Sequence, residues 1–330
     1  ANGLVRGCVV KGAKRPDERL IRSRVALAHG LPYRQDLARL SEERIAALGT
    51  FTSVSVGLED PEVPQRDKRV VITVVEQLTQ YLEPRIGFST GEGFRFAFEY
   101  GNRNFAGGAQ ALTLRVQLSY LPDIFVPESV KTVYRATEID NVAYRLERRN
   151  AASLLLPDIG LGPLVGLNVD LIDVKDVQRD YGLGKEALVP TITFRPNRQL
   201  TFQGSLSAEY NDVLVFKQCS PGPDPNTDIC VRADTLNLLR VPEGQTVAFS
   251  QRVGATWDAR NNPFAATSGV LLAGGVEHVN AFAVGAPPAG QTTQSDSHFI
   301  KLTGKAVGYI PLGPPGLTLA MSLAGGWNIQ

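Results

Sequence analysis

Hydrophobic and polar residues alternate with a period of two on both sides of an Asn/Gly-rich turn in the segment 88–120. Before the turn the apolar positions are Phe94, Phe96, Phe98 and Tyr100, and after it they are Leu112, Leu114, Val116 and Leu118. Such alternation predicts β-strands with one apolar and one polar face. A soluble β-sandwich is the alternative, but its strands are rarely this long. A strand that crosses a bilayer obliquely needs about 9 to 11 residues of this pattern.

The same alternation returns along the rest of the chain and predicts about eleven strands from residue 81 onward. Their expected bounds are 81–89, 94–105, 110–121, 143–156, 164–178, 186–195, 200–216, 246–258, 270–283, 298–310 and 317–328. Short Gly/Pro/Asn turns alternate with longer polar segments, and the long segments 122–142, 217–245 and 284–297 are expected to be extracellular. This layout is typical of a transmembrane antiparallel β-barrel, and we therefore predict a mainly β fold.

Residues 1–77 follow a different pattern and predict a small α+β domain. Helical spacing marks Asp17–Ala28 and Arg34–Leu48, and strands are expected at Leu4–Val10, Phe51–Leu58 and Arg69–Val75. The order is β-α-α-β-β, which suits two helices packed on one face of a three-stranded sheet. The predicted domains are therefore 1–77 and a barrel domain over 78–330.

The expected number of strands is odd, whereas single-chain bacterial barrels have an even number. The chain also stops at 327–330 without the aromatic strand end that usually closes such barrels. We therefore expect a chain whose C-terminal barrel strands are missing. A miscounted strand is the alternative interpretation.

Composition and charge exclude several classes of function. The formal net charge is +1 and no basic cluster carries interleaved aromatic residues, which argues against a nucleic-acid partner. No apolar run approaches the roughly 20 residues of a membrane helix, so any crossing must be by strands. His29, His278 and His298 lie far apart and match no catalytic or metal-ligand spacing. We predict a protein that is not an enzyme and needs no cofactor or metal.

Charged residues on the polar faces of the predicted strands are expected to form ion pairs or to be solvated, without a catalytic role. They are Arg95, Glu99, Arg115, Lys301 and Lys305.

Cysteine usage indicates an oxidising compartment. Cys219 and Cys230 flank a Pro/Asp/Asn-rich loop that has nothing to pack around, and we predict a disulfide between them. A bridge across so short a loop contributes about 3 kcal/mol on the chain-entropy account. A zinc site is the competing interpretation, but no histidine or second cysteine pair lies nearby in the sequence. Cys8 is expected to be a packed strand residue.

Three segments together resemble the BamA/TamA superfamily, whose members join POTRA domains to an outer-membrane barrel. The run LARLSEERIAALGTFTSVSV within 31–56 looks like a POTRA helix and strand, and GNRNF at 101–105 resembles the turn between the family's second and third barrel strands. The third segment, 256–264, resembles the family's Asp-x-Arg-Asp/Asn-x-Pro turn through Asp258, Arg260, Asn262 and Pro263. Asp258 and Arg260 are expected to fix this turn by side-chain hydrogen bonds.

The resemblance implies a protein that inserts other β-barrel proteins into the bacterial outer membrane, with its POTRA domain in the periplasm. Implied partners are nascent outer-membrane β-barrel proteins, outer-membrane lipids and periplasmic accessory proteins. In this family the first barrel strand pairs weakly with the last, and the seam opens to template an incoming strand. The corresponding gate residues here are Tyr81, Leu82, Pro84, Ile86, Gly87 and Phe88.

Within the predicted gate strand, Pro84 removes a donor and Gly87 removes a packing side chain, so the sequence itself predicts a weak seam. Alternatively, Pro84 simply marks where the linker enters the barrel. Two other functions stay open: a two-partner secretion translocator, and a membrane anchor for an upstream enzymatic domain such as a patatin-like lipase. The family's Arg-Gly-aromatic motif on the sixth extracellular loop is expected to lie beyond residue 330.

Overall fold

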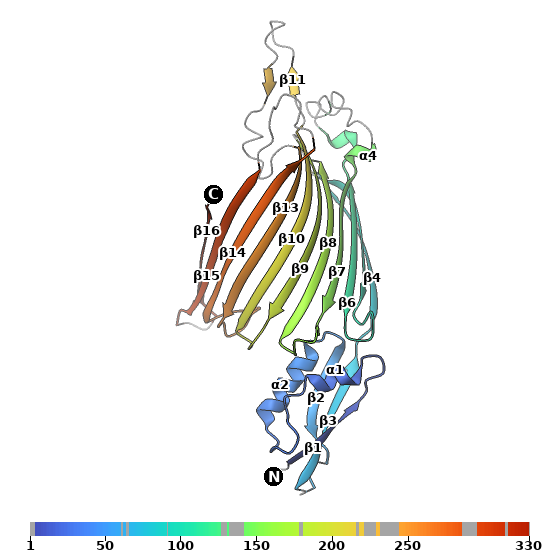
Figure 1. The fold of residues 1–330 in the computed structure, drawn as a ribbon, viewed down its shortest axis with the longest axis vertical. Coiled ribbons are helices and arrows are strands. Elements are labelled where there is room, and N and C mark those ends of the chain that lie inside the picture. Colours follow the sequence, from blue (N-terminus) through green and yellow to red (C-terminus); the bar gives the residue numbers. More distant parts are fainter. Residues whose placement is uncertain are drawn as a thin grey trace. The chain divides into compact units, whose positions relative to one another are not determined.

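The computed structural model describes residues 4–60, 62–63, 66–90, 92–126, 131, 142–177, 181–215, 218–220, 229–231, 244–285, 296–313 and 316–329. The chain forms two compact units (Figure 1). The first contains Ala1–Leu82, Tyr100–Thr113 and Ser153–Asn168, and the second contains Glu83–Glu99, Leu114–Ala152 and Val169–Gln330. The N-terminal domain therefore clusters with two hairpin turns of the large sheet.

The N-terminal domain has the predicted β-α-α-β-β order. Its elements are β1 (Leu4–Lys11), α1 (Glu18–Ser23), α2 (Gln35–Ala46), β2 (Phe51–Leu58) and β3 (Asp67–Glu76). The sheet order is β1-β3-β2, with β1 parallel and β2 antiparallel to β3. Its core joins Ile21 and Ile45 of the helices to Val5, Val70 and Ile72 of the strands, all less than 2% exposed.

The first helix is shorter than the sequence predicted. Asp17 caps its N-terminus by accepting a hydrogen bond from the backbone N–H of Arg19 (2.8 Å), but the helix ends at Ser23 rather than Ala28. The Ser41 hydroxyl of α2 accepts the backbone N–H of Ala26 (2.9 Å), so this donor bonds to α2 and not within a continued helix. The segment after α1 is therefore bonded to α2.

Eleven strands form one sheet, as predicted, and Figure 1 shows them side by side. The sheet order is β16-β15-β14-β13-β10-β9-β8-β7-β6-β5-β4. The strands are β4 (Gln80–Ser89), β5 (Gly93–Asn102), β6 (Ala111–Tyr120), β7 (Glu147–Leu156), β8 (Val165–Val177), β9 (Tyr181–Phe194), β10 (Leu200–Val215), β13 (Gly244–Asp258), β14 (Gly269–Val284), β15 (Ser297–Pro311) and β16 (Thr318–Ile329).

Two strand bounds in the large sheet differ from the prediction by four or more residues. The predicted start of β7 at residue 143 is wrong, because Val142–Arg145 forms the short helix α4. Arg145 is nearly buried and bonds the Leu121 carbonyl and the Asp123 carboxylate, beside the 3-10 helix η1 (Asp123–Phe125). Strand β9 begins at Tyr181 rather than residue 186, since β10 extends far enough to pair with it.

The cross-strand pairing of β13 to β16 shows how the two faces of the sheet differ. A row of paired residues on these four strands is apolar and 38% to 71% exposed, and it consists of Val253, Val276, Leu302 and Trp327. The row one position away consists of Ser205, Arg252, Glu277, Lys301 and Asn328. A one-residue slip would exchange these rows, so the alternation fixes the register. We call the two sides the apolar face and the polar face.

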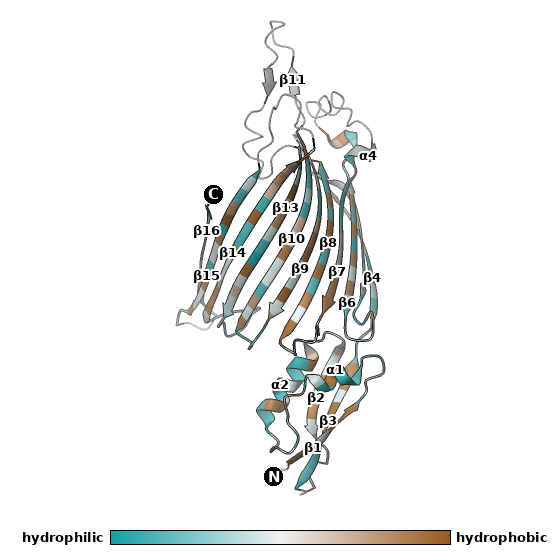
Figure 2. Cartoon of the chain, viewed as in Figure 1, coloured by the Kyte–Doolittle hydropathy of each residue, from teal (hydrophilic) through white to brown (hydrophobic). Residues whose placement is uncertain are grey.

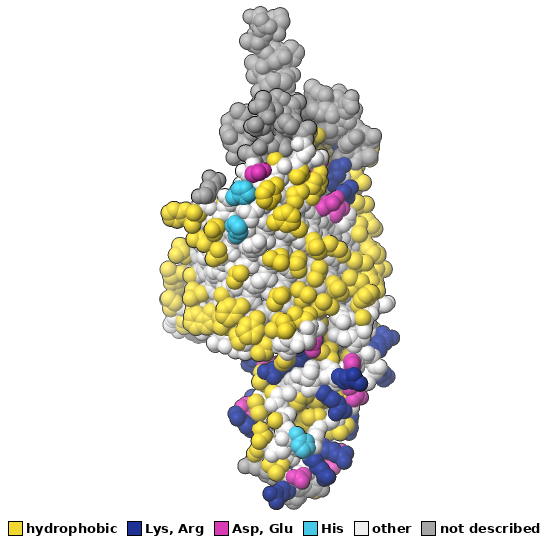
Figure 3. Space-filling model, viewed as in Figure 1, with side chains coloured by type: hydrophobic (Ala, Val, Ile, Leu, Met, Phe, Trp, Pro, Cys, Tyr) yellow, Lys and Arg dark blue, Asp and Glu magenta, His cyan; other side chains and the backbone are white. Residues whose placement is uncertain are grey.

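Hydropathy and surface views agree with this division. Apolar and polar residues succeed each other along the strands in Figure 2. Apolar side chains cover most of the visible sheet surface in Figure 3, whereas charged side chains gather on the N-terminal domain. A cavity of about 440 Å³ is lined by polar-face residues that include Gln203, Arg252 and Lys305. In the described residues, no helix is long and apolar enough to cross a membrane.

Candidate functional site

The predicted gate strand lies at one edge of the eleven-stranded sheet, where β4 has β5 as its neighbour. Every residue of β4 except Tyr81 is classed as exposed. The apolar-face side chains Leu82, Ile86 and Phe88 are 57%, 84% and 49% exposed. A strand at such an edge presents backbone N–H and C=O groups to any chain that can pair with it. All six predicted gate residues thus lie on one strand.

Two of the predicted gate residues bring few interactions to β4. Pro84 has no backbone N–H and lies in the middle of β4. A side chain at Gly87 would meet no atom within 4 Å, so the strand is loosely packed there. The weak seam itself stays a prediction.

Ion pairs on the polar face hold the centre of β4. Glu99 of β5 is only 8% exposed and accepts hydrogen bonds from Arg115 of β6 (2.9 and 3.1 Å) and from Arg85 of β4 (3.3 Å). Arg85 also pairs with Glu83 in its own strand (2.7 Å). The predicted polar-face ion pairing is therefore present at Glu99 and Arg115. It links β4 to the next two strands through side chains.

An aromatic ring fixes the start of β4. Tyr81 lies against the α-carbon of Gly101 in β5, where an added Cβ would be 2.0 Å from the ring. The Arg103 guanidinium lies 4.7 Å from the centre of the same ring and donates a hydrogen bond to the Leu78 carbonyl (2.9 Å). The Arg103 backbone N–H bonds the Thr79 carbonyl (2.8 Å). These contacts set where the chain enters the sheet.

Within the first unit, α1 contacts two of the sheet's hairpin turns. The Asp17 backbone N–H bonds the Gly107 carbonyl (3.1 Å). Arg24, only 3% exposed, donates to the Pro157 carbonyl (2.6 Å) and lies 3.7 Å from the Asp158 carboxylate. Burial lowers the pKa of Arg24, and the charge of Asp158 opposes that shift. The helix is therefore fastened to the turns that follow β5 and β7.

At the other end of β4, Phe88 contacts two further rings. Its ring centre is 5.0 Å from that of Phe94 and 5.1 Å from that of Phe125. Phe125 and Arg24 were not singled out by the sequence analysis, since neither lies in a recognisable motif. Arg103 lies within the GNRNF segment that supported the resemblance.

The turn motif after β13 has the expected hydrogen bonds. Arg260 donates to both carboxylate oxygens of Asp258 (2.8 and 2.7 Å), and this pair raises the pKa of Arg260. Asn262 accepts the backbone N–H of Phe264 (2.9 Å), and Pro263 lies between them. Six strands separate β13 from β4 in the sheet, so the structure does not bring the motif and the gate strand together.

The predicted disulfide lies largely outside the described residues. Backbone pairing places Cys219 of β11 (Gln218–Ser220) opposite Cys230 of β12 (Ile229–Val231), but their side chains are not among those described. The bridge stays a prediction. Cys8 is the packed strand residue that was expected, because it lies in β1 against the domain core and burial raises its pKa.

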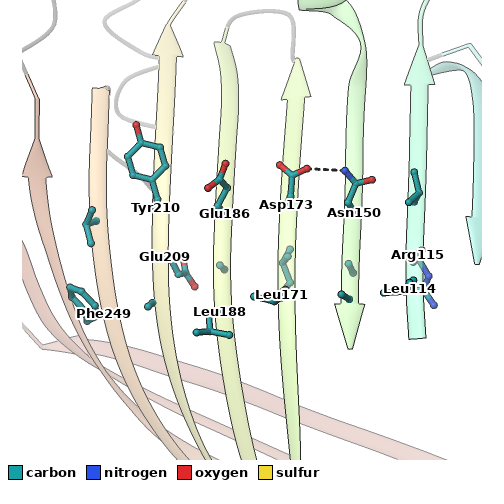
Figure 4. A pocket seen from close by; sticks show the side chains of 17 residues that line it. Leu114, Arg115, Asn150, Leu171, Asp173, Glu186, Leu188, Glu209, Tyr210 and Phe249 are labelled. Carbon is teal, nitrogen blue, oxygen red and sulfur yellow. Dashed lines mark hydrogen bonds between the residues drawn. The ribbon is translucent and has the colours of Figure 1, made fainter. Parts of the chain in front are cut away.

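A shallow cavity of about 690 Å³ lies along the strands from β6 to β13 (Figure 4). Its apolar lining includes Leu114, Leu171, Leu188 and Phe249, and Asn150, Asp173, Glu186 and Tyr210 add polar groups. Asn150 donates to Asp173 (2.8 Å), which also holds Arg148 in a bidentate pair. The cavity thus borders a band of hydrogen-bonded polar groups. No group of His, Cys, Asp and Glu that could hold a metal occurs in the part of the chain described.

Comparison with known proteins gives a family and a fold. Residues 78–329 match the Omp85 superfamily domain, and no curated protein sequence matches significantly. A structure of Haemophilus ducreyi BamA lacking POTRA domains 1-3 has a TM-score of 0.60 at 14% identity, covering 98% of this chain and 55% of that one.

Two structures of CdiB are also similar. The one from Acinetobacter baumannii has a TM-score of 0.53 at 12% identity, covering 100% of this chain and 53% of that one. The one from Escherichia coli has a TM-score of 0.55 at 12% identity, with coverages of 99% and 54%. The chain spans about half the length of the solved structures it matches. Since the domain match covers most of the chain and the sheet agrees with it, this chain belongs to the Omp85 superfamily of outer-membrane β-barrel proteins.

Proposed function

We propose that this protein inserts β-barrel proteins into the bacterial outer membrane and that β4 is the template strand for its clients. Omp85 proteins are generally non-enzymatic transporters or insertases, and that broader role accompanies family membership. The observation that carries the finer proposal is the composition of β4 at its centre, where Pro84 has no backbone N–H and Gly87 has open space in place of a packing side chain. Addition of a strand to a sheet edge gains affinity from backbone hydrogen bonds, which suits clients of varied sequence.

The N-terminal domain is, in this proposal, a periplasmic POTRA domain that covers residues 1–77. Its β-α-α-β-β order and its contacts with the turns after β5 and β7 support that assignment. Short turns of the sheet lie at the end where β4 starts, which is the periplasmic end in this arrangement. The proposed partners are nascent barrel proteins, outer-membrane lipids and periplasmic accessory proteins.

A two-partner secretion translocator is the second candidate, because the structural likeness does not separate BamA from CdiB. A role as membrane anchor for an upstream enzymatic domain is a third. The insertase and the anchor differ in whether β4 must be exposed. An insertase has to expose β4 to its client, whereas an anchor does not.

The test is a covalent lock on the seam of the full-length protein. Gly87→Cys, at a position with open space around it, would be bridged to a cysteine in the strand that closes the barrel. We expect this lock to abolish insertion of a client barrel into proteoliposomes and reduction of the bridge to restore it.

The matched control is a lock between strands that are already neighbours. Ser207→Cys with Ser250→Cys joins cross-strand partners of β10 and β13 and should leave insertion unchanged. Insertion that survives the Gly87 lock, or is lost equally in both locks, would show that clients do not pass through β4.

A further inference from the structure

Beside the start of β4, the first unit contains a cavity of about 630 Å³ that the template role does not by itself explain. The first two residues of β4, Gln80 and Tyr81, form part of its lining. Glu76, the last residue of β3, and the linker 77–79 form another part, and Leu78 in this linker is 82% exposed. A bound chain segment would therefore meet the cavity where β4 begins.

The cavity is positively charged. Its lining holds three cations, Lys14, Arg15 and Arg103, against one carboxylate, Glu76, which leaves a net charge of +2. Glu76 already accepts hydrogen bonds from the backbone N–H groups of Lys14 and Arg15 (2.9 Å for Arg15). Its charge is thus engaged with the loop after β1. The lining therefore favours an anion.

The two guanidinium groups are held in place and retain donors. Arg15 donates one hydrogen bond to the Thr79 hydroxyl (2.8 Å), and Arg103 donates one to the Leu78 carbonyl while its plane is held near Tyr81. A guanidinium carries five N–H donors, so each can bond a carboxylate oxygen without giving up these contacts. Arg prefers planar carboxylates because two N–H groups can bind both oxygens.

The direction of β4 determines which end of an added strand lies beside the cavity. β4 runs away from the linker, so a strand that pairs with it in the antiparallel sense runs toward the linker. A client's terminal strand that pairs along the whole of β4 therefore ends beside Gln80. Its free α-carboxyl group has an ordinary pKa of about 3.5 and is ionised at neutral pH.

We propose that this cavity binds the C-terminal carboxylate of the client strand that pairs with β4, through Lys14, Arg15 and Arg103. The inference rests on the proposed template function and adds a feature that every client with a terminal strand shares. Strand addition combined with carboxylate capture fixes the register of the added strand, because only one residue of a chain carries the terminal group. The backbone hydrogen bonds to β4 supply affinity, and the cavity sets where the C-terminus of the client strand lies.

The test uses the full chain in maltoside micelles, which contain no phosphate, and one labelled peptide in two forms. The peptide has the sequence of β5, GFRFAFEYGN, and ends in a free carboxylate or an amide. We expect the free acid to bind about tenfold more tightly, as for one charge-assisted hydrogen bond partly open to water. In Lys14→Gln/Arg15→Gln the acid should bind like the amide, whose affinity should not change.

Arg39→Gln is the matched control, since Arg39 is an exposed cation of the same domain outside the cavity. It should leave the preference for the acid intact. Equal binding of acid and amide to the unmodified chain would overturn the carboxylate site and leave the template role standing. Binding of neither form would refute the template role together with the site. Loss of the preference on addition of phosphatidylglycerol would show a lipid phosphate site instead.

Discussion

Gly101→Ala tests whether the Tyr81 ring sets the start of β4. A Cβ built on Gly101 lies 2.0, 2.2 and 2.6 Å from Cε1, Cζ and Oη of Tyr81. To reach an ordinary contact of 3.4 Å, the ring must retreat by about 1.4 Å. That movement disturbs the contact with Arg103, whose guanidinium lies 4.7 Å from the ring centre.

Overpacking of this kind costs about 1 to 3 kcal/mol, and loss of an exposed cation–π contact about 0.5 to 1 kcal/mol. We therefore expect Gly101→Ala to destabilise the refolded chain by about 2 to 3 kcal/mol. The measurement is urea unfolding in detergent micelles, followed by circular dichroism. Removal of the ring should remove most of the cost, so that Gly101→Ala in a Tyr81→Ala background costs about 0.5 kcal/mol.

Gly87→Ala is the matched control, because it adds the same methyl group to the polar face of β4 where nothing lies within 4 Å. Its effect should stay within about 0.5 kcal/mol. The reasoning is refuted if Gly101→Ala costs no more than Gly87→Ala. It is also refuted if the cost persists in full when Tyr81 is already alanine.

Two further measurements test contacts elsewhere. Arg24→Met keeps the packing of the stem but removes the hydrogen bond to Pro157, so hydrogen exchange in the turn 157–164 should accelerate about thirtyfold, equivalent to about 2 kcal/mol. Arg22→Met is the control, because its partner Glu18 is exposed, and it should change the exchange rate little. Equal effects of the two substitutions would contradict a fastening role for Arg24. If Cys219 and Cys230 are bridged, intact mass under non-reducing conditions should be lower by two hydrogens, whereas two thiols that react with iodoacetamide in the folded chain would disprove the bridge.

Most of the fold was predictable because the alternation of apolar and polar residues within a strand depends on its own two faces. Residues two apart share a face, so the alternation around Phe96 and Leu114 predicted strands without knowledge of their partners. The same holds for the order of elements in the N-terminal domain, where helical spacing and Gly49 marked α2. The Asp258–Arg260 turn was predictable because its hydrogen bonds join residues two positions apart.

The contacts that hold the candidate site depended on the tertiary structure, because they join residues distant in sequence. Arg24 bonds to Pro157 across 133 positions, and the backbone N–H of Ala26, after α1, bonds to Ser41 of α2. The sequence determined that β4 would be a poorly built strand, through Pro84 and Gly87. Only the folded chain showed that the start of β4 adjoins three cations drawn from two separate segments, since residues far apart in the sequence meet there.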